Sequence, residues 1–283
     1  MRCLILGASG FLGRHVYTAL CADPRLEVHT AGRRAAHADL WLDLTRAGAA
    51  AVAEVLRVAA PAVVVNCVGA VAGDPAGLAA GNVVSVAALL DGIGRLPYPP
   101  RLVHVGCAAE YRPVDAYATT KLAGTELLLA ARRQGVPAVV LRVFDPLGPG
   151  SPAGSVAGRL AAAVAMAART GEPARVGRLA GYRDFVDVRD VAAAVLAAAT
   201  APELPPPLLN VGSGRATAVR TLAAALVARS GGPGVLESGA APAETATTWQ
   251  RADLTATMAA LGWRPTVDLG ASVRDMLPQA VPV

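Results

Sequence analysis

The hydrophobic positions of this chain follow two alternating patterns along its first half. Short continuous apolar runs predict strands near residues 2–6, 26–30, 62–67, 101–106 and 138–143. Between these runs, apolar residues recur three and four positions apart, which predicts helices near 14–22, 47–59, 78–94 and 116–134. Strands that alternate with helices in this way predict an α/β fold with a parallel, doubly wound sheet. Further helices are expected near 153–170 and 188–200, and a further strand near 208–211.

A glycine-rich turn joins the first predicted strand to the first predicted helix, in the stretch LILGASGFLGRHV at residues 4–16. Gly7 allows the tight turn, Gly10 lets the backbone approach a pyrophosphate, and Gly13 lets the helix pack closely on the strand. The helix N-terminus offers free N–H groups and the positive end of a dipole to phosphates. We therefore predict a dinucleotide-binding Rossmann domain, with a plain glycine turn as the simpler alternative. The residues predicted to bind the dinucleotide here are Gly7, Ser9, Gly10, Phe11, Leu12 and Gly13.

The residues after the second predicted strand indicate which dinucleotide is bound. An NAD-binding unit carries an acidic residue about 20 residues beyond the glycines, where it binds the ribose 2′-hydroxyl. The chain instead reads Thr30-Ala31-Gly32-Arg33-Arg34. A guanidinium pairs with a 2′-phosphate through two charge-assisted hydrogen bonds, whereas a carboxylate would repel it. We infer that the cofactor is NADP(H), bound by Arg33 and Arg34, although only one of them need bind; the alternative is that both are solvated surface residues.

The alternation of predicted strands and helices is interrupted by a Gly- and Pro-rich loop, FDPLGPGSP at residues 144–152, and by a Pro-rich linker at residues 205–207. We expect an NADP-binding Rossmann domain over residues 1–150, to which 183–215 returns. Residues 151–182 and 216–283 are expected to form a small C-terminal substrate-binding lobe. A chain of 283 residues is long enough to bury a core in both parts.

Composition narrows the classes of function. The net charge of +5 fits either an ordinary Arg-rich surface or a site for polyanions such as NADP(H) or a nucleotide sugar. Basic residues do not cluster among aromatic ones, so we expect no nucleic-acid partner. The 4 cysteines include no Cys-x-x-Cys pair, which predicts reduced thiols, no metal site and a cytoplasmic location. We expect no signal peptide before the first strand, and no membrane span, because Pro61, Asn66, Asp74 and Asp91 interrupt the uncharged runs.

The segment from Tyr117 to Lys121, YATTK, is a candidate for proton transfer. Residues four apart lie on one face of a helix, and a Lys ammonium beside a phenol lowers the pKa of the Tyr. The Tyr can then pass a proton to or from a carbonyl or alcohol while hydride moves to or from a nicotinamide. The spacing alone arises often by chance. Its position, at the start of the helix after the fourth predicted strand, favours a catalytic role.

Together these features resemble the extended short-chain dehydrogenase/reductase family, also called the NAD-dependent epimerase/dehydratase family. The resemblance extends over nearly the whole chain and rests on several motifs in the family's order. The motifs are the glycine triplet, Asp43-Leu44, Asn82 in GNVVSVAALLDG, Tyr117 with Lys121, LRVFDPLGPG (141–150), YRDFVDVRDV (182–191), LNVGSG (209–214) and LGWRP (261–265). Within the family, these motifs most resemble those of reductases acting on NDP-4-keto-6-deoxyhexoses.

The resemblance implies catalytic roles for three of these residues. Tyr117 is expected to be the proton donor. Lys121 is expected to bind the nicotinamide ribose and to lower the Tyr pKa. Asn82 is expected to help hold the active-site helix, with a cap or loop hydrogen bond as the alternative.

The resemblance also implies binding roles. Asp43 should lie at the adenine with Leu44 beside it, and residues 66–69 should line the cofactor near its ribose; these include Cys67, Val68 and Gly69. Arg183 should reach the phosphates of a sugar nucleotide, with a structural salt bridge as the alternative.

The sequence departs from the family pattern after the fourth predicted strand, where Cys107 stands at the usual Ser or Thr position. A thiol is a weak hydrogen-bond donor. Cys107 therefore assists catalysis poorly, or substrate and Tyr117 manage without it, or it is only a small buried residue. Ala108 and Ala109, at the substrate, replace the Asp-Glu pair of dehydratases and argue against 4,6-dehydration. Glu110 comes one residue too late and should point elsewhere on an extended segment.

These observations lead to a first hypothesis, an NADPH-dependent ketoreductase in which Tyr117 protonates the ketone oxygen. The ketone would belong to an NDP-4-keto-6-deoxysugar or to another secondary metabolite, such as an aromatic polyketide antibiotic, because the short loop 112–116 leaves room for a larger substrate. A nucleotide-sugar epimerase and a non-catalytic NADP-sensing protein are the alternatives. A homodimer through the helices near 78–94 and 116–134 is common in the family.

Overall fold

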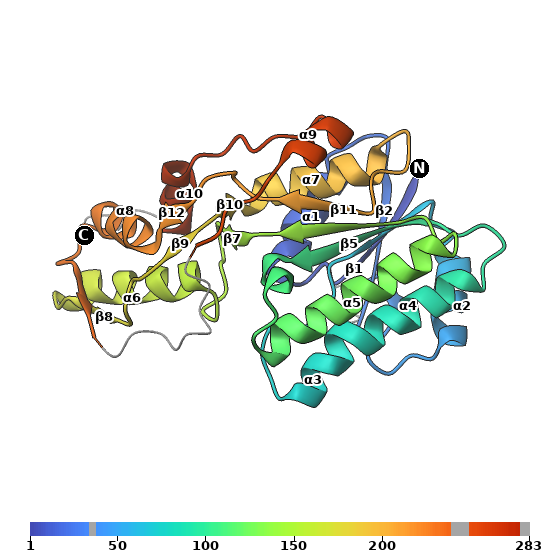
Figure 1. The fold of residues 1–283 in the computed structure, drawn as a ribbon, viewed down its shortest axis with the longest axis horizontal. Coiled ribbons are helices and arrows are strands. Elements are labelled where there is room, and N and C mark those ends of the chain that lie inside the picture. The colour runs from blue at the N-terminus through green and yellow to red at the C-terminus, as the bar shows by residue number, and fades with distance from the viewer. Residues whose placement is uncertain (34–37, 239–248, 278–283) are drawn as a thin grey trace. The chain divides into compact units, whose positions relative to one another are not determined.

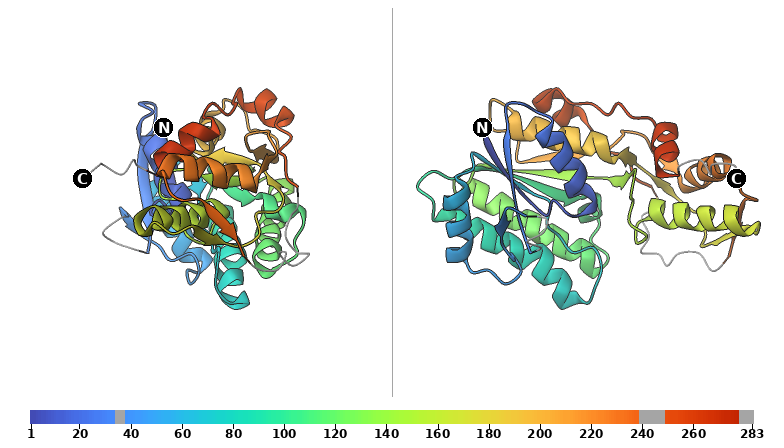
Figure 2. Two further views of the ribbon diagram at one scale, coloured as in Figure 1. Left: turned by 90° about the vertical axis from the view of Figure 1, so that its left-hand side faces the viewer. Right: turned by 180° about the vertical axis from the view of Figure 1, so that it is seen from behind.

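The computed structural model describes residues 1–33, 38–238 and 249–277. The chain forms two compact units, each made of several segments (Figures 1 and 2). The first unit contains residues 1–143, 191–211 and 254–264, and the second contains residues 144–190, 212–253 and 265–283.

A seven-stranded sheet in the order β11-β6-β5-β4-β1-β2-β3 forms the centre of the first unit. Every neighbouring pair in it is parallel. The reversal of strand order beside β1 places the C-terminal ends of β1 and β4 at a switch point, where ligands of such sheets bind. The strands are β1 (Arg2–Leu6), β2 (Glu27–Gly32), β3 (Leu40–Trp41), β4 (Val63–Asn66), β5 (Arg101–Cys107), β6 (Ala138–Val143) and β11 (Leu208–Val211).

Helices cover both faces of this sheet (Figure 1). Side chains of α2, α4 and α5, such as Leu56, Leu89 and Leu128, share one core with alternate strand residues such as Leu4 and Val64. The other face is covered by α1 and α7 (Figure 2). The helices are α1 (Phe11–Cys21), α2 (Ala49–Ala59), α3 (Pro75–Ala79), the π-helix η2 (Ala80–Val84), α4 (Ser85–Gly94), the 3-10 helix η3 (Ala108–Tyr111), α5 (Ala116–Arg133), α7 (Val188–Thr200) and α9 (Thr255–Leu261).

The second unit has a core of its own between helices and three short strand pairs. Leu160 of α6 and Leu222 of α8 lie in this core with Phe185 and Val273. The pairs are β7 with β10, β9 with β12, and β8 with β13. Its elements are β7 (Asp145–Leu147), α6 (Val156–Thr170), β8 (Ala174–Val176), β9 (Tyr182–Arg183), β10 (Phe185–Asp187), β12 (Thr217–Ala218), α8 (Val219–Ser230), β13 (Val235–Glu237) and α10 (Leu269–Met276).

The units divide the chain at other residues than the predicted domain and lobe. Residues 144–150 and 183–190 lie in the second unit, because β7 pairs with β10 along its length. Residues 254–264 lie in the first unit, where the Thr257 hydroxyl donates to the Asn210 carbonyl at 2.6 Å.

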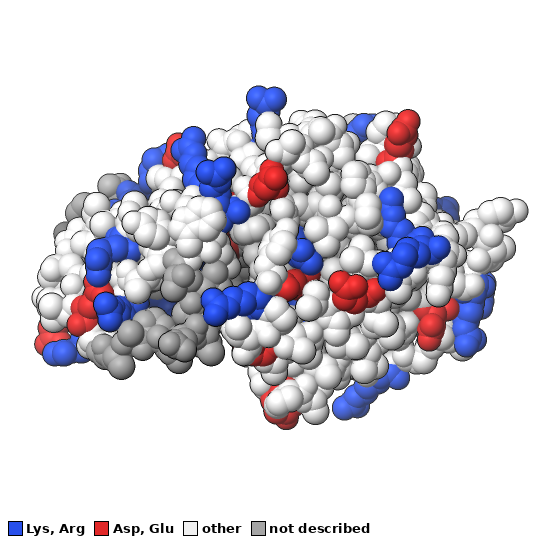
Figure 3. Space-filling view, in the orientation of Figure 1, with Lys and Arg blue, Asp and Glu red and all other residues white. Residues whose placement is uncertain are grey.

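The helical run Pro75–Gly94 differs from the expectation that polar residues interrupt every long apolar stretch. By length and composition alone it is apolar enough to cross a membrane, and Asp91 lies within it. Val86, Leu89 and Ile93 of this run are buried in the first core, so their apolar character is used in packing against the sheet. Basic and acidic side chains are interspersed on the face drawn in Figure 3.

Candidate cofactor and active site

The glycine loop after β1 has the close packing that its sequence predicts. Gly7 has a φ of +80°, and a Cβ added to it would lie 3.0 Å from the backbone of Cys67. The Gly10 amide donates to the Gly7 carbonyl at 3.1 Å. A Cβ added to Gly13 would lie 2.0 Å from the Gly7 oxygen, so only glycine allows α1 to begin this close to the strand.

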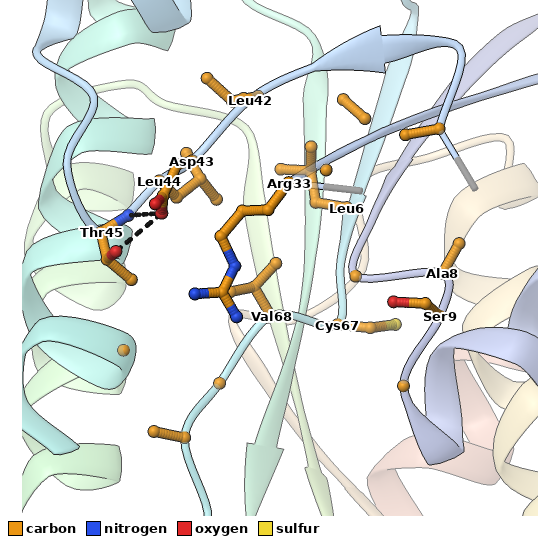
Figure 4. Close-up of a pocket in the computed structure, with 18 of the residues that line it drawn as sticks. Leu6, Ala8, Ser9, Arg33, Leu42, Asp43, Leu44, Thr45, Cys67 and Val68 are labelled. Carbon is orange, nitrogen blue, oxygen red and sulfur yellow. Dashed lines mark hydrogen bonds between the residues drawn. The ribbon is translucent and has the colours of Figure 1, made fainter. Parts of the chain in front are cut away.

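A cavity of about 410 Å³ opens beside this loop (Figure 4). The backbone of the loop forms one end, and the N-terminus of α1 behind it provides N–H groups for a phosphate. The segments after β2, β3 and β4 form the rest. The lining residues are Leu6, Gly7, Ala8, Ser9, Gly10, Ala31, Gly32, Arg33, Ala38, Leu42, Asp43, Leu44, Thr45, Cys67, Val68, Gly69, Ala70, Gly77 and Gly81.

Arg33 and Asp43 lie at the end of the cavity away from the glycine loop. The Arg33 side chain extends between Thr45 and Val68 (Figure 4). Asp43 accepts hydrogen bonds from the Thr45 amide at 3.0 Å and the Thr45 hydroxyl at 2.7 Å. Burial raises the pKa of Asp43, but the Thr45 hydrogen bonds and the charges of Arg33 and Arg46 outweigh burial and hold it below its usual value. Asp43 is therefore ionised beside the guanidinium at neutral pH.

Most of the predicted cofactor residues line the cavity, and several do not. Phe11, Leu12 and Gly13 lie in α1 behind the loop, where the Phe11 ring packs edge-on against His15. Arg34 falls outside the described residues. Three further residues line the cavity without having been predicted: Thr45, which no motif marks, and Gly77 and Gly81, whose four-residue spacing on a helix was a signal available in the sequence.

The described residues fit a dinucleotide. A tight loop with no side chain at Gly7 or Gly10 leaves backbone room for a pyrophosphate, and a cation and a carboxylate stand at the far end for the adenosine ribose. The residues that would hold the cofactor are the cavity-lining residues named above.

Tyr117 lies in the first turn of α5, which begins after Asp115. The Asp115 carboxylate caps this helix by accepting from the Ala118 amide at 2.7 Å. The Cys107 side chain interacts with Tyr117, and each shifts the pKa of the other. Burial, the Cys107 contact and the carboxylates of Glu110 and Asp115 raise the pKa of Tyr117. The phenol of Tyr117 is protonated at neutral pH, as that of an ordinary tyrosine is, and it holds its proton more firmly.

Lys121 lies one helical turn after Tyr117 on α5, and its role toward the Tyr and the nicotinamide ribose stays a prediction. Its ammonium donates to the Val105 carbonyl of β5 at 2.8 Å, and the residue is 7% exposed. Burial lowers the pKa of Lys121. The pKa of Tyr117 is raised rather than lowered as the spacing predicts, first by burial, then by Cys107, and to a smaller extent by Glu110 and Asp115.

Asn82 lies in the π-helix η2 and joins the loop after β4 to α5. Its Oδ1 accepts from the Ala70 amide at 2.9 Å, and its Nδ2 donates to the Ala70 carbonyl at 2.8 Å and to the Thr120 hydroxyl at 3.1 Å. A Cβ on Gly124 would lie 2.3 Å from the Asn82 carbonyl, so η2 and α5 pack closely. The side chain thus ties the cavity wall at Ala70 to the helix that carries Tyr117.

The segment after Cys107 is not extended as predicted, because Ala108–Tyr111 forms a 3-10 helix. Within it Ala108 is buried and Ala109 is half-buried. The Ala109 amide donates to the Cys107 sulfur at 3.3 Å, and the Cys107 amide donates to Glu110 at 2.7 Å. These two bonds close the turn. Burial raises the pKa of the Cys107 thiol, so the thiol is neutral.

Arg183 lies in the second unit and forms an ion pair with Asp145. Its Nη1 donates to the two carboxylate oxygens at 3.1 and 3.3 Å, and both side chains are largely buried. Burial raises the pKa of Asp145, against the opposing effect of Arg183. The structural salt bridge considered as the alternative for Arg183 is therefore present.

Comparison with known proteins places this geometry in a family. The model of the NAD dependent epimerase/dehydratase family matches residues 3–212. The chain is 33% identical over 301 residues to the dTDP-6-deoxy-L-talose 4-dehydrogenase (NAD(P)(+)) of Kitasatospora kifunensis, covering 97% of this chain and 94% of that protein.

Two solved structures show the same fold. UDP-glucuronic acid 4-epimerase from Bacillus cereus, in complex with UDP-glucuronic acid and NAD, has a TM-score of 0.84 at 19% identity over 97% of each chain. RMD from Pseudomonas aeruginosa, complexed with NADPH, has a TM-score of 0.79 at 24% identity over 97% of this chain and 95% of that one. The chain therefore belongs to the NAD-dependent epimerase/dehydratase family of extended short-chain dehydrogenases/reductases, with a nicotinamide dinucleotide as its cofactor.

Proposed function

We propose that this protein is an NADPH-dependent ketoreductase that reduces a ketone of an NDP-4-keto-6-deoxysugar or a related secondary metabolite. The observation that carries the proposal is the place of Tyr117, in the first turn of α5 and next to Cys107 at the end of β5. Reduction of a ketone needs a group that gives a proton to the developing alkoxide, and a tyrosine phenol at this place can be that group.

The substrate class is supported by the relative from Kitasatospora kifunensis, a 4-dehydrogenase of a dTDP-6-deoxysugar. Oxidation of a 4-hydroxyl and reduction of the 4-keto compound are the two directions of one hydride transfer. The bound nicotinamide supplies the hydride. The Tyr117 hydroxyl then donates its proton to the substrate oxygen, and Cys107, which interacts with the Tyr117 side chain, helps to fix its direction.

The preference for NADP(H) is supported by Arg33, whose side chain extends along the cavity wall. A guanidinium there would pair with a 2′-phosphate. An aromatic polyketide ketone is the second candidate substrate, favoured by residues 112–116, which are all exposed and form only a short connection before α5. A cytoplasmic location is supported by the four cysteines, all of them free thiols.

The test is NADPH oxidation by the purified protein with a dTDP-4-keto-6-deoxyhexose and a polyketide ketone in parallel, with NADH as the comparison. We expect turnover with the sugar nucleotide, and Tyr117→Phe should lower kcat by about 100-fold or more because the proton donor is lost. NADPH should still bind to this variant. Tyr98→Phe removes an exposed hydroxyl and is the matched control. Full turnover by Tyr117→Phe, or reduction of neither ketone, contradicts the proposal.

A further inference from the structure

Glu110 is a buried carboxylate that the proposed reaction does not use. Its side chain is fully buried, and that of its partner Arg142 is 9% exposed. Arg142 donates from Nε to Glu110 Oε2 at 3.0 Å, and its Nη2 lies 3.0 Å from the same oxygen in an ion pair. The other oxygen, Oε1, accepts from the Cys107 amide at 2.7 Å. Both carboxylate oxygens are therefore engaged, one by a charge and one by the backbone beside the proton donor.

The sheet places this pair at the C-terminal ends of three neighbouring strands. Arg142 of β6 stands between Gly106 of β5 and Asn210 of β11 in the strand register. A Cβ on Gly106 would lie 2.9 Å from Glu110 Oε1, so the missing side chain leaves the room that the carboxylate occupies. The position of Glu110 therefore depends on a residue without a side chain on the adjacent strand.

Tyr111 holds the pair from the other side. The guanidinium of Arg142 lies 4.3 Å from the centre of the Tyr111 ring, in a cation–π contact. The Tyr111 hydroxyl donates to Asn210 Oδ1 at 2.8 Å, which fixes the ring over the guanidinium. Because Arg142 is held on both sides, its charge defines one position for the carboxylate of Glu110.

The contacts continue from Glu110 to the proton donor. Glu110 accepts from the Cys107 amide, the Ala109 amide donates to the Cys107 sulfur, and the Cys107 side chain interacts with that of Tyr117. We propose that Glu110 and Arg142 are positioning residues, which fix Cys107 and, through its thiol, orient the Tyr117 hydroxyl for proton transfer. This inference rests on the proposed function for its effect on turnover, but not for its effect on Cys107.

Two double variants separate position from charge. Glu110→Leu with Arg142→Leu replaces the pair by apolar side chains of similar bulk, leaves no buried charge unpaired and removes the contact to Cys107. Glu110→Gln with Arg142→Gln also removes both charges, but its amide oxygen still accepts from the Cys107 amide and its amide groups can bond to each other. Neither residue lines the cofactor cavity, so NADPH affinity should be unchanged in both.

The experiment measures kcat, NADPH affinity and the rate at which iodoacetamide alkylates Cys107, followed by peptide-resolved mass spectrometry. The exposed Cys21 in the same samples is the internal control. In the Leu/Leu variant we expect kcat to fall by about 10- to 100-fold, because a small displacement of a catalytic group costs that much. Cys107 should be alkylated faster, because its thiol is no longer held. The Gln/Gln variant should return both values toward those of the parent protein.

If iodoacetamide alkylates Cys107 at the same rate in the Leu/Leu variant as in the parent protein, the proposal is overturned, whether or not any ketone is reduced. A Gln/Gln variant as impaired as Leu/Leu would also overturn it, because the effect would then come from charge. If the parent protein reduces no ketone, the proposed function fails, while faster alkylation that is reversed by Gln/Gln still supports the positioning role.

Discussion

Arg33 bears most directly on the choice between NAD(H) and NADP(H). Among the described residues that line the cavity, it is the one with a positively charged side chain. Its neighbour Asp43 is ionised and held by Thr45, so this end of the cavity carries both signs of charge. The two groups suit different parts of one ligand: the carboxylate can accept from hydroxyl or amino groups, and the guanidinium can donate to a phosphate.

Replacing Arg33 by Ala should therefore weaken NADPH binding selectively. Loss of charge-assisted hydrogen bonds to a phosphate is expected to raise the Kd for NADPH by about 10- to 100-fold, and to leave that for NADH nearly unchanged. Fluorescence titration with both cofactors measures the two constants. Arg57→Ala, which removes an exposed arginine of α2, is the control. Equal weakening of both cofactors would mean that Arg33 does not contact a 2′-phosphate.

At the scale of the elements, the sequence predicts most of the helices and strands whose apolar residues recur at a regular spacing. The strands β1, β6 and β11 and the helix α7 have the expected bounds, because each combines strong apolar periodicity with clear flanking residues. β3 was missed because its two residues form a strand only by pairing with the end of β2. The 3-10 helix at Ala108–Tyr111 was missed because Arg142, 32 residues away in the sequence, holds its Glu110.

Part of the candidate site was likewise predictable from the sequence, and part was not. The glycines were predictable, since a positive φ at Gly7 and a close approach at Gly13 are local requirements of a strand–turn–helix. The orientation of Lys121 was not, since its ammonium bonds to Val105 on a strand that the helical spacing to Tyr117 does not include. Local backbone geometry depends on adjacent residues and can be predicted from them. Hydrogen-bond partners from other elements depend on the tertiary fold and cannot.

The end of α2 offers a test of element stability. Ala60 caps this helix with φ 42° and ψ 50°, and Pro61 follows it. A residue with a Cβ is strained in this left-handed conformation, whereas glycine is not. Ala60→Gly should therefore raise the free energy of unfolding by about 0.5–1 kcal/mol in urea denaturation. Ala51→Gly, at an exposed position inside α2, should lower it by about the same amount, so a loss in both variants would show that Ala60 is unstrained.

At the scale of the whole molecule, the described residues are stabilised by buried apolar cores more than by ion pairs. One core lies between the large sheet and α2, α4 and α5, another joins α6, α8 and α10, and Leu20 of α1 and Val195 of α7 are also fully buried. Several ion pairs of the described residues join exposed side chains, which contribute little. Beneath the candidate active site, however, polar groups are buried in the middle of the sheet. His104 of β5 is 1% exposed, and its Nδ1 lies 3.1 Å from Asn66 Nδ2 of β4.

His104 should make the stability of the protein depend on pH. Burial, and then the positive charge of Lys121, lower its pKa well below the usual value, so the folded protein keeps this ring neutral. The unfolded chain protonates it below about pH 6.5 and then binds more protons than the folded state. The free energy of unfolding should therefore be highest above that pH and fall, by up to about 1.4 kcal/mol per pH unit, as the pH drops toward 5.

Urea denaturation across this range should show the slope in the parent protein and in His29→Gln, which removes a partly exposed histidine of β2. It should be shallower in His104→Gln, whatever that variant's stability at neutral pH, because the group that takes up the proton on unfolding is gone. Equal slopes in all three proteins would mean that His104 is protonated to the same extent in the folded and unfolded chain.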